Sequence, residues 1–460
     1  MRRRQEMTSS HRLYHNMKLF DGHVEALQDR RIVITNGEVI EGIADINEID
    51  HYRDCEKIDL AGNTMLPGFI DAHIHITVPF VMKVTPMGLL QMNRQVEKNL
   101  ENCLKYGVTT IRDVASFPRK MLKWRRRIDS NAAIGPRIVT SLSFITCPKG
   151  VPEMVPTLNF IEACITGGQF AERVSTPGEV TKVANRLLDM GADFLKTQYT
   201  ANSFLFHGKI PNLSDDCFDA LVQVGRKRGV KVAMHHLERE GFIKGVAAGV
   251  NTLEHCATDQ LEDAEIERFV KQGMAIVPTT KVMADYLEVE EILNFLKTKG
   301  SEDLLSEPLR QSVEGVEVLF RKPYPPPDYA TQFYPDVEFF KRSYPIVLKN
   351  IEKIKKAGGT IGVGTDCCGT GLSFFGTYWK ELKALTHAGL TCVEALKAAT
   401  SINAGIIGMA DRVGTIEPGK YADFTIIDGD PLQDITVAEN ISMVVKGGEI
   451  AVKDGKVVRS

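Results

Sequence analysis

Two histidines stand one residue apart in a strand-like stretch near the start of the chain. Residues 66–79 read LPGFIDAHIHITVP, a mostly apolar run that carries Asp71, His73 and His75. Alternate residues of a strand project to one face, so the two imidazoles could together bind one metal ion. The alternative is a hydrogen-bonded pair of core histidines, and the rest of the chain has to decide between them.

More polar residues occur near the ends of later apolar runs. Lys196 lies in DFLKTQY, His235 in KVAMHH, His255 in NTLEHC and Asp366 in TIGVGTD. A lysine in an apolar strand is rarely buried without a partner. Any one of these residues could be structural, but their shared position at strand ends favours a metal site, because Zn²⁺ and similar ions bind imidazole and carboxylate groups.

The lysine suggests two metal ions rather than one. Two ions a few ångströms apart need a bridging anion, and Lys196 carbamylated by CO₂ would supply one. Paired ions lower the pKa of the water between them and polarise a carbonyl oxygen. A carboxylate at the site can then take the proton of the attacking water and pass it to the leaving group. This set of residues therefore predicts hydrolysis by a metal-activated hydroxide.

The middle of the chain alternates strand-like runs with helical patterns. The eight candidate strands are residues 68–75, 109–115, 137–145, 193–199, 231–236, 251–256, 274–279 and 360–366. Parallel strands need helical crossovers, so eight such units predict a (β/α)8 TIM-type barrel, in which the carboxyl ends of the strands carry the chemistry. Residues 280–359 are too long for one crossover and include YPPPDY, so we expect an insertion there.

Local signals place several helix ends. Apolar residues at a helical period occur over residues 89–104, and Gly107 follows them. Thr176 with Glu179, and Thr391 with Glu394, have the spacing of capping boxes at helix starts.

Both ends of the chain have the short alternating runs and glycine turns of antiparallel strands. We expect them to form one small β-sandwich domain together. The predicted domains are residues 1–66 and 410–460, as the two parts of the sandwich, and residues 67–409 as the barrel.

Composition restricts the partners. The net charge is −3, with 25% charged residues, which gives no electrostatic basis for binding nucleic acid or a membrane surface. The basic start MRRRQEM is not followed by an apolar segment, and nine scattered cysteines do not suggest a disulfide framework. We expect a cytoplasmic protein that acts on a small molecule.

Several motifs, in this order, resemble those of the amidohydrolase superfamily. AGNTMLPGFIDAHIHI resembles the entry into that superfamily's first barrel strand, and five further stretches resemble its branch of imidazolonepropionase-like and Xaa-Pro or Xaa-Arg dipeptidase-like enzymes. These five are YGVTTIRDV, GPRIVTS, GADFLK, AAGVNTLEHC and GTIEPGKYADFTIIDGDPL. The resemblance covers nearly the whole chain.

The resemblance implies a role for each candidate residue. His73 and His75 match the pair on the buried metal, and Lys196 matches the carbamylated bridging lysine. His235 and His255 match the histidines of the more exposed metal; His235 is preferred over His236 because it lies twenty positions before His255. Asp366 matches the catalytic aspartate, which is both a metal ligand and a proton shuttle. The resemblance also implies two divalent ions, zinc or else manganese, cobalt or iron, and a homo-oligomer.

The predicted function is hydrolysis of an amide-type C–N bond in a dipeptide, N-acyl amino acid, carbamate or urea. Some pocket stretches differ from those of the dipeptidase-like relatives, among them ITCPKGVP after the third strand. The alternatives are a deaminase or cyclic-amide hydrolase on the same scaffold, a phosphotriester or lactone hydrolase, and a non-catalytic scaffold relative. Retention of every expected ligand argues against the last.

Other polar residues receive weaker assignments. Tyr199 and His207 follow the fourth strand and are candidates for binding substrate. Asp71 is expected to form structural hydrogen bonds, and Arg112 with Asp113 a structural ion pair at the barrel rim. The basic run KWRRR, residues 123–127, is interpreted as a solvated helix face.

Overall fold

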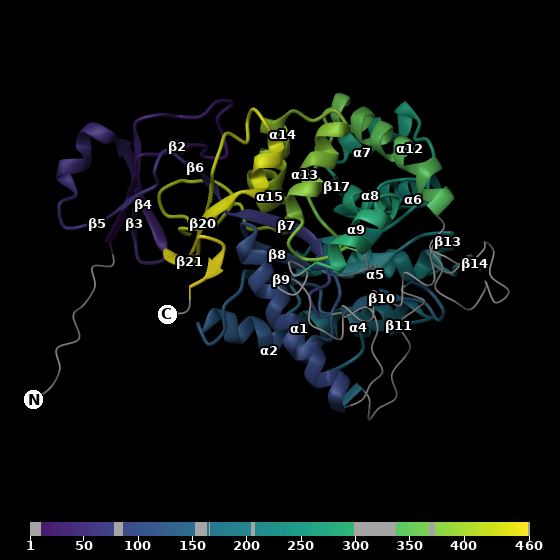
Figure 1. The fold of residues 1–460 in the computed structure, drawn as a ribbon. Coiled ribbons are helices and arrows are strands. Elements are labelled where there is room, and N and C mark those ends of the chain that lie inside the picture. Colours follow the sequence, from purple (N-terminus) through teal and green to yellow (C-terminus); the bar gives the residue numbers. More distant parts are fainter. Residues whose placement is uncertain are drawn as a thin grey trace, which may run out of the picture.

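Figure 1 shows a helix-covered body with a β-rich part to which both ends of the chain contribute. The computed structural model describes residues 11–77, 86–151, 163–164, 166–203, 208–298, 337–367 and 373–458. The first strands and the last strands lie at the same end of the molecule, as their purple and yellow colours show in Figure 1.

Parallel strands form the centre of the body in two groups. The smaller sheet has the order β7-β8-β9 and the larger has the order β11-β10-β12-β15-β16-β17-β18. Their bounds are β7 Phe69–Ile74, β8 Val108–Asp113, β9 Arg137–Thr140, β10 Phe144–Thr146, β11 Ala171–Arg173, β12 Leu195–Gln198, β15 Val232–His235, β16 Thr252–Glu254, β17 Ala275–Val277 and β18 Thr360–Ile361. The expected eight strand segments are therefore present, and every neighbouring pair in these two sheets is parallel.

Backbone hydrogen bonds connect the two groups at both sides. The Asp193 amide donates to the Thr140 carbonyl (2.8 Å), just before β12 and at the end of β9. On the other side, the Ala72 amide of β7 donates to the Val363 carbonyl (2.9 Å), and the Asp366 amide donates to the His73 carbonyl (2.7 Å).

One expected strand is divided. Residues 137–145 were expected to be continuous, but β9 and β10 are separate and belong to different sheets. Leu142 has a φ of 65° between them, a left-handed conformation that no strand continues through. The prediction of a single strand was wrong because the alternation of apolar residues does not report a local reversal of φ.

Helices follow most of the parallel strands, as their amphipathic patterns predict. They are α1 Pro86–Lys105, α2 Pro118–Asp129, α4 Pro177–Met190, α5 Asp215–Arg228, α6 Arg239–Ala248, α7 Asp263–Lys271, α8 Thr280–Leu287, α9 Val289–Leu296, α12 Val337–Lys356, α13 Tyr378–His387, α14 Cys392–Lys397 and α15 Asn403–Ile407, with a π-helical turn at Ala398–Ile402. Both predicted capping boxes are confirmed, at the starts of α4 and α14. None of the helices in the described residues is both long and apolar enough to cross a membrane.

The segment 280–359 has ordered helices at both ends. It begins with α8 and α9, ends with α12 and the turn before β18, and α12 contacts both α8 and β18. Residues 299–336, which include YPPPDY, lie outside the described residues. The structure therefore places α12 where a barrel crossover helix belongs, next to the strand that follows it.

The two ends of the chain share a sheet. This sheet has the order β2-β6-β19-β20-β21-β22, and β6 pairs antiparallel with β19. A second sheet, β4-β3-β1-β5, packs beside it through a core cluster that includes Tyr14, Met65 and Phe424. The bounds are β1 His11–His15, β2 Lys18–Leu19, β3 Arg31–Asn36, β4 Val39–Asp45, β5 Glu56–Asp59, β6 Thr64–Pro67, β19 Phe424–Ile427, β20 Ile441–Lys446, β21 Glu449–Lys453 and β22 Lys456–Val457. Strands from both ends of the chain therefore pair within one sheet.

Candidate metal centre

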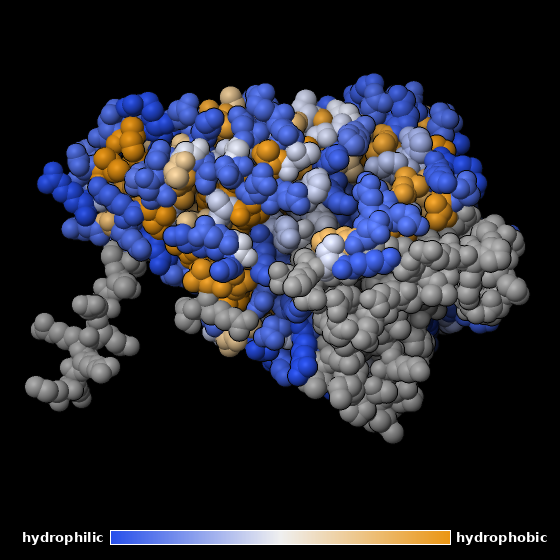
Figure 2. Space-filling model, viewed as in Figure 1, coloured by the Kyte–Doolittle hydropathy of each residue, from blue (hydrophilic) through white to orange (hydrophobic). Residues whose placement is uncertain are grey.

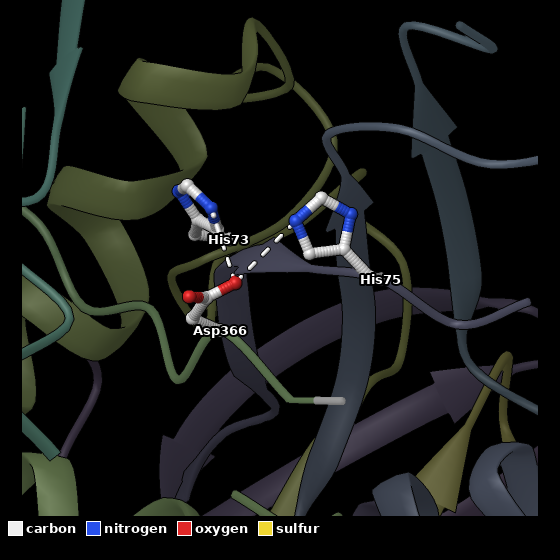
Figure 3. Close-up of side chains that lie close together, drawn as sticks. All are labelled: His73, His75 and Asp366. Carbon is white, nitrogen blue, oxygen red and sulfur yellow. Dashed lines mark ion pairs between the residues drawn. The ribbon is translucent and has the colours of Figure 1, made fainter. Parts of the chain in front are cut away.

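Three of the predicted ligands form a compact group. His73 is in β7, His75 follows that strand, and Asp366 lies after β18. His73 Nε2 is 3.5 Å and His75 Nε2 is 3.4 Å from the same oxygen, Asp366 Oδ1, and Figure 3 shows the carboxylate facing both rings. One ligand atom from each residue lies within 4.8 Å of the others. The backbone bond from Asp366 to His73 explains this proximity, because it holds the two strand ends together.

The ring nitrogens of the histidines are oriented by their outer hydrogen bonds. His73 Nδ1 donates to Glu254 Oε2 (2.6 Å), and His75 Nδ1 donates to the Ala115 carbonyl (3.0 Å). His255 Nδ1 shares a hydrogen bond of 2.6 Å with Thr279 Oγ1. A proton on Nδ1 leaves the lone pair of Nε2 free, which is the usual arrangement of a metal-ligating histidine.

The remaining predicted ligands surround this group. The ring centroid of His255 lies 4.9 Å from that of His73 and 4.5 Å from that of His235. Lys196 pairs with Phe144 of β10 and Ala233 of β15 in the sheet register. Three of the buried side-chain atoms that have no hydrogen-bond partner among the described residues belong to this group: Lys196 Nζ, His235 Nε2 and Asp366 Oδ1. Buried polar atoms are normally satisfied, so an amine, an imidazole and a carboxylate left without partners fit a site for metal ions.

The choice of His235 over His236 agrees with the geometry. The His235 ring lies against the His255 ring. The His236 ring turns the other way: its Nδ1 donates to the Glu254 carbonyl (3.0 Å) and its face packs near Phe242 of α6. Consecutive strand residues point to opposite sides, and here that places His235 among the candidate ligands.

Burial keeps all four imidazoles neutral. It lowers the pKa of His73 to about 4, with help from the positive charge of Lys196, and the pKa of His75 to about 3, with help from His73. Burial also holds the pKa values of His235 and His255 well below the ordinary value. Metal binding requires the neutral imidazole, so these four histidines could bind a metal ion without first losing a proton.

The lysine and the aspartate have shifted pKa values as well. Burial lowers the pKa of Lys196 to about 7, so a large fraction of this amine is neutral near neutral pH. Burial raises the pKa of Asp366 to about 7, although the charge of Lys196 opposes this shift. Such values cluster at functional sites, and a neutral amine is the form that can react with CO₂.

Sequence reasoning missed Glu254. This residue is fully buried at the end of β16 and accepts hydrogen bonds from Arg112 (2.9 Å), Thr252 Oγ1 (2.7 Å) and His73. Burial alone would raise the pKa of Glu254, but Arg112 and Lys196 hold it well below the ordinary value. The available signal was a glutamate inside an apolar strand, directly before a candidate ligand.

The expected ion pair between Arg112 and Asp113 was wrong. Arg112 is 1% exposed and pairs with Glu254, and its guanidinium lies 4.3 Å from the centre of the Phe194 ring. Asp113 instead accepts from the Ile76 amide (2.8 Å) and from Ser116 Oγ (2.7 Å). Neighbouring strand residues face opposite sides of a sheet, so these two side chains could not meet.

Backbone strain is concentrated at the strand ends that carry the site. His255 has a φ of 69°, Thr279 of 50° and Asp366 of 51°. Non-glycine residues seldom adopt this left-handed conformation, which costs of order 1–3 kcal/mol per residue and is typical of functional sites. Here it turns the chain at three strand ends so that the His255 and Asp366 side chains face the site.

The other predictions have mixed outcomes. Asp71 accepts hydrogen bonds from Thr365 Oγ1 (2.6 Å), the Thr365 amide (3.1 Å) and the His73 amide (3.2 Å), which confirms its structural role. The Tyr199 hydroxyl donates to Glu240 Oε1 (3.1 Å), in the first turn of α6, so its role with substrate stays a prediction. His207 lies outside the described residues.

Comparison with known proteins identifies the family. A model of the amidohydrolase family matches residues 64–451, which is most of the chain and includes every candidate ligand. The chain therefore belongs to the amidohydrolase family.

Individual relatives agree with this assignment. The chain is 36% identical over 104 residues to an imidazolonepropionase of Geobacillus kaustophilus, a stretch that spans 22% of this chain and 24% of that relative. It is 23% identical over 425 residues to an imidazolonepropionase of Phocaeicola vulgatus, across 88% of this chain and 87% of the relative. The crystal structure of a Xaa-Pro dipeptidase with bound methionine superimposes with a TM-score of 0.72 at 24% identity, covering 96% of this chain and 99% of the other. This last likeness shows a shared fold.

Proposed function

We propose that this protein is a metal-dependent hydrolase that cleaves an amide-type C–N bond in a small molecule. The observation that carries the proposal is the convergence of His73, His75 and Asp366 at the carboxyl ends of parallel strands, where each offers one ligand atom within 4.8 Å of the others. A buried group of this composition has little value as packing, and its donor atoms are those that divalent transition metals prefer.

In this proposal the ligands divide between two sites. His73 and His75 would hold one ion, His235 and His255 the other, and Lys196, as a carbamate, would bridge them with Asp366 as a further ligand. The neutral amine of Lys196 would attack the carbon of CO₂, so that a C–N bond forms while one C=O π bond opens onto oxygen, and the proton lost from nitrogen would pass to water to leave the anionic carbamate. Bound divalent ions, which we propose are zinc, would lower the pKa of a water molecule and polarise the carbonyl of the substrate.

Asp366 is the proposed acid and base. Its Oδ1 atom is buried without a partner of its own among the described residues and faces both His73 and His75. From this position Asp366 accepts the proton of the attacking water and delivers it to the nitrogen that leaves. Glu254, held by Arg112, orients His73 throughout and does not take part in the proton transfer.

We also propose that the two parallel sheets form one closed (β/α)8 barrel. The bonds from Asp193 to Thr140 and from Ala72 to Val363 support closure on both sides. The proposed domain limits are residues 1–66 and 410–460 for the β-sandwich and 67–409 for the barrel, with an insertion within 280–359. We propose that the protein is cytoplasmic and that it forms a homo-oligomer. Size-exclusion chromatography with light scattering would check the oligomeric state.

The first experiment measures metal content together with the effect of Asp366→Asn. We expect the purified protein to contain about two divalent ions per chain, and the variant to lose at least about 100-fold in kcat with its substrate. A protein that remains metal-free after incubation with Zn²⁺, Mn²⁺, Co²⁺ and Fe²⁺, or a variant with full activity, would contradict the proposal.

The second experiment identifies the substrate. The metal-loaded enzyme is tested against dipeptides, N-acyl amino acids, carbamates, ureas and cyclic amides, and ammonia release is followed on aminated heterocycles. The main proposal expects cleavage of an open-chain amide, carbamate or urea. The second candidate is a cyclic-amide hydrolase or deaminase, and the likeness to imidazolonepropionases over most of the chain favours testing it.

The bridging role of Lys196 has its own test. Methionine has a similar length but cannot form a carbamate, so Lys196→Met should bind about one ion per chain instead of two and lose most of its activity. Metal analysis and kcat are measured for the wild type and the variant. Bicarbonate should increase the activity of wild-type enzyme prepared without CO₂ and leave the variant unchanged; a variant that keeps two ions would exclude the carbamate.

A further inference from the structure

A cavity lined by basic residues lies between α1 and α2. Its volume is about 630 Å³, and Thr166 and Gly167 close one side of it. Gly167 accepts a hydrogen bond from the Arg119 amide (2.8 Å), which fixes that wall against the first turn of α2. The ionisable side chains that line it are Arg94, Glu97, Arg119, Lys120, Lys123 and Arg127.

The described residues that line this cavity carry an excess of positive charge. Among them, five are basic and one, Glu97, is acidic. Within the described residues, Arg94, Arg119, Lys123 and Arg127 have no carboxylate within 4.0 Å, whereas Arg125 of the same helix pairs with Asp193 (2.9 Å). The basic run of α2 is therefore divided: Arg125 has a structural partner, whereas Lys123 and Arg127 line the cavity.

Two side chains are held in place before any ligand arrives. The Arg127 guanidinium lies 4.5 Å from the centre of the Trp124 ring, and its Nη2 donates to the Ala132 carbonyl (3.5 Å), so two contacts fix its position. Lys120 is half-buried, and burial, with the positive charge of Lys123, lowers its pKa to about 8. Clustered cations that repel one another are stabilised when an anion binds between them.

The geometry points to a site for a small anion that carries phosphate groups, in the cavity between α1 and α2. Guanidinium and ammonium groups that converge on a hollow match phosphate oxygens, which accept bidentate and charge-assisted hydrogen bonds. The volume is in the range of small-molecule pockets, roughly 300–1,000 Å³.

The size of the ligand follows from the charge of the whole chain. The net charge of the chain is −3, so the basic cavity differs in sign from the protein as a whole. A long polyanion that extended beyond the cavity would be repelled by the negative charge of the protein. Figure 2 shows a hydrophilic surface where Figure 1 draws α1, as expected of a charged groove rather than an apolar docking face. The cavity contains none of the candidate metal ligands, so this site is independent of the proposed hydrolysis.

Isothermal titration of the full-length, metal-loaded protein with inorganic pyrophosphate tests the proposal. We expect saturable binding that weakens as salt increases, because exposed charges are screened. The double variant Lys123→Gln/Arg127→Gln should bind at least about tenfold more weakly, since it removes two charged donors. Thermal unfolding without pyrophosphate confirms that the variant is folded.

A matched control removes the same charge elsewhere. Arg268→Gln/Lys271→Gln changes two exposed basic residues of α7, and its affinity for pyrophosphate should stay within about twofold of the wild type. The proposal would be overturned if the wild type did not bind pyrophosphate, or if the wild type, the cavity variant and the α7 control bound it with equal affinity. Equal affinity would assign the anion to the metal centre. Tighter binding of an oligonucleotide than of pyrophosphate, lost in the cavity variant, would overturn the assignment to a small ligand.

Discussion

At the scale of single residues, Glu254 controls which nitrogen of His73 faces the candidate metal centre. The carboxylate accepts a hydrogen bond from His73 Nδ1 on one oxygen and from the Arg112 guanidinium on the other. It thereby holds both the tautomer and the orientation of the ring. Partners of this kind commonly change metal affinity or activity by 10- to 100-fold when they are altered.

Glu254→Gln should therefore weaken metal binding or reduce kcat about 10- to 100-fold. Glutamine keeps the shape of the side chain, but it removes the negative charge that balances Arg112. Metal competition titrations and steady-state kinetics measure the effect. Glu267→Gln, on the exposed side of α7, is the control and should behave like the wild type; unchanged metal affinity and kcat in Glu254→Gln would refute the role.

At the scale of elements, the site depends on how closely the segment after β18 approaches β7. Gly364 lies in that segment, and a Cβ atom added there would be 2.6 Å from the Cβ atom of His73 and 2.6 Å from Cγ1 of Val277. Neither neighbour is the end of a flexible side chain. The glycine is thus needed for packing, because it lets the segment after β18 approach β7 at the candidate ligand His73.

Gly364→Ala should lower the free energy of unfolding by about 1–3 kcal/mol and reduce metal affinity, because His73 has to move. Thermal unfolding and metal titration measure the two effects. Gly405→Ala is the matched control: Gly405 lies in α15 with nothing within 4 Å of an added Cβ atom, so alanine should be neutral or stabilising by about 1 kcal/mol. Equal thermal unfolding midpoints for Gly364→Ala and Gly405→Ala would contradict the proposed packing role of Gly364.

At the scale of the whole molecule, buried acids make stability depend on pH. Glu381 of α13 accepts hydrogen bonds from Thr280 Oγ1 (2.9 Å), the Thr280 amide (3.0 Å) and the Lys281 amide (2.6 Å), so it joins α13 to α8. Burial raises its pKa to about 7. The folded state then holds a proton that the unfolded chain has already released, so stability falls as pH rises from about 4.5 to about 7.

Glu381→Gln should make the unfolding midpoint less dependent on pH between 5 and 8. The difference from the wild type is on the order of 1–3 kcal/mol across this window, since each pKa unit corresponds to about 1.4 kcal/mol. Thermal unfolding at several pH values measures it. Glu352→Gln should follow the wild-type slope, because the pKa of exposed Glu352 is lowered to about 2 by Lys349 and Lys356 and so lies below the window. If the unfolding midpoint changed with pH in the same way in the wild type, Glu381→Gln and Glu352→Gln, the role of Glu381 in the pH dependence would be refuted.

The sequence alone determined those features that depend on local periodicity and on residue type. His73 and His75 share a face because a strand repeats every two residues. The capping boxes of α4 and α14 follow from pairs three positions apart, and the strand and helix order predicts parallel sheets. Chemically unusual residues at strand ends, such as Lys196, were therefore identifiable as site candidates before their positions in space were known.

The tertiary structure decided which side chains meet. Glu254 and His73 are 181 positions apart, and nothing in the local pattern of either strand specifies that contact or the pairing of Glu254 with Arg112. The division of residues 137–145 and the left-handed turns at His255 and Asp366 were equally invisible. Periodicity reports which face a residue occupies, whereas packing between distant strands determines the register, the backbone strain and the buried charge partners that complete the site.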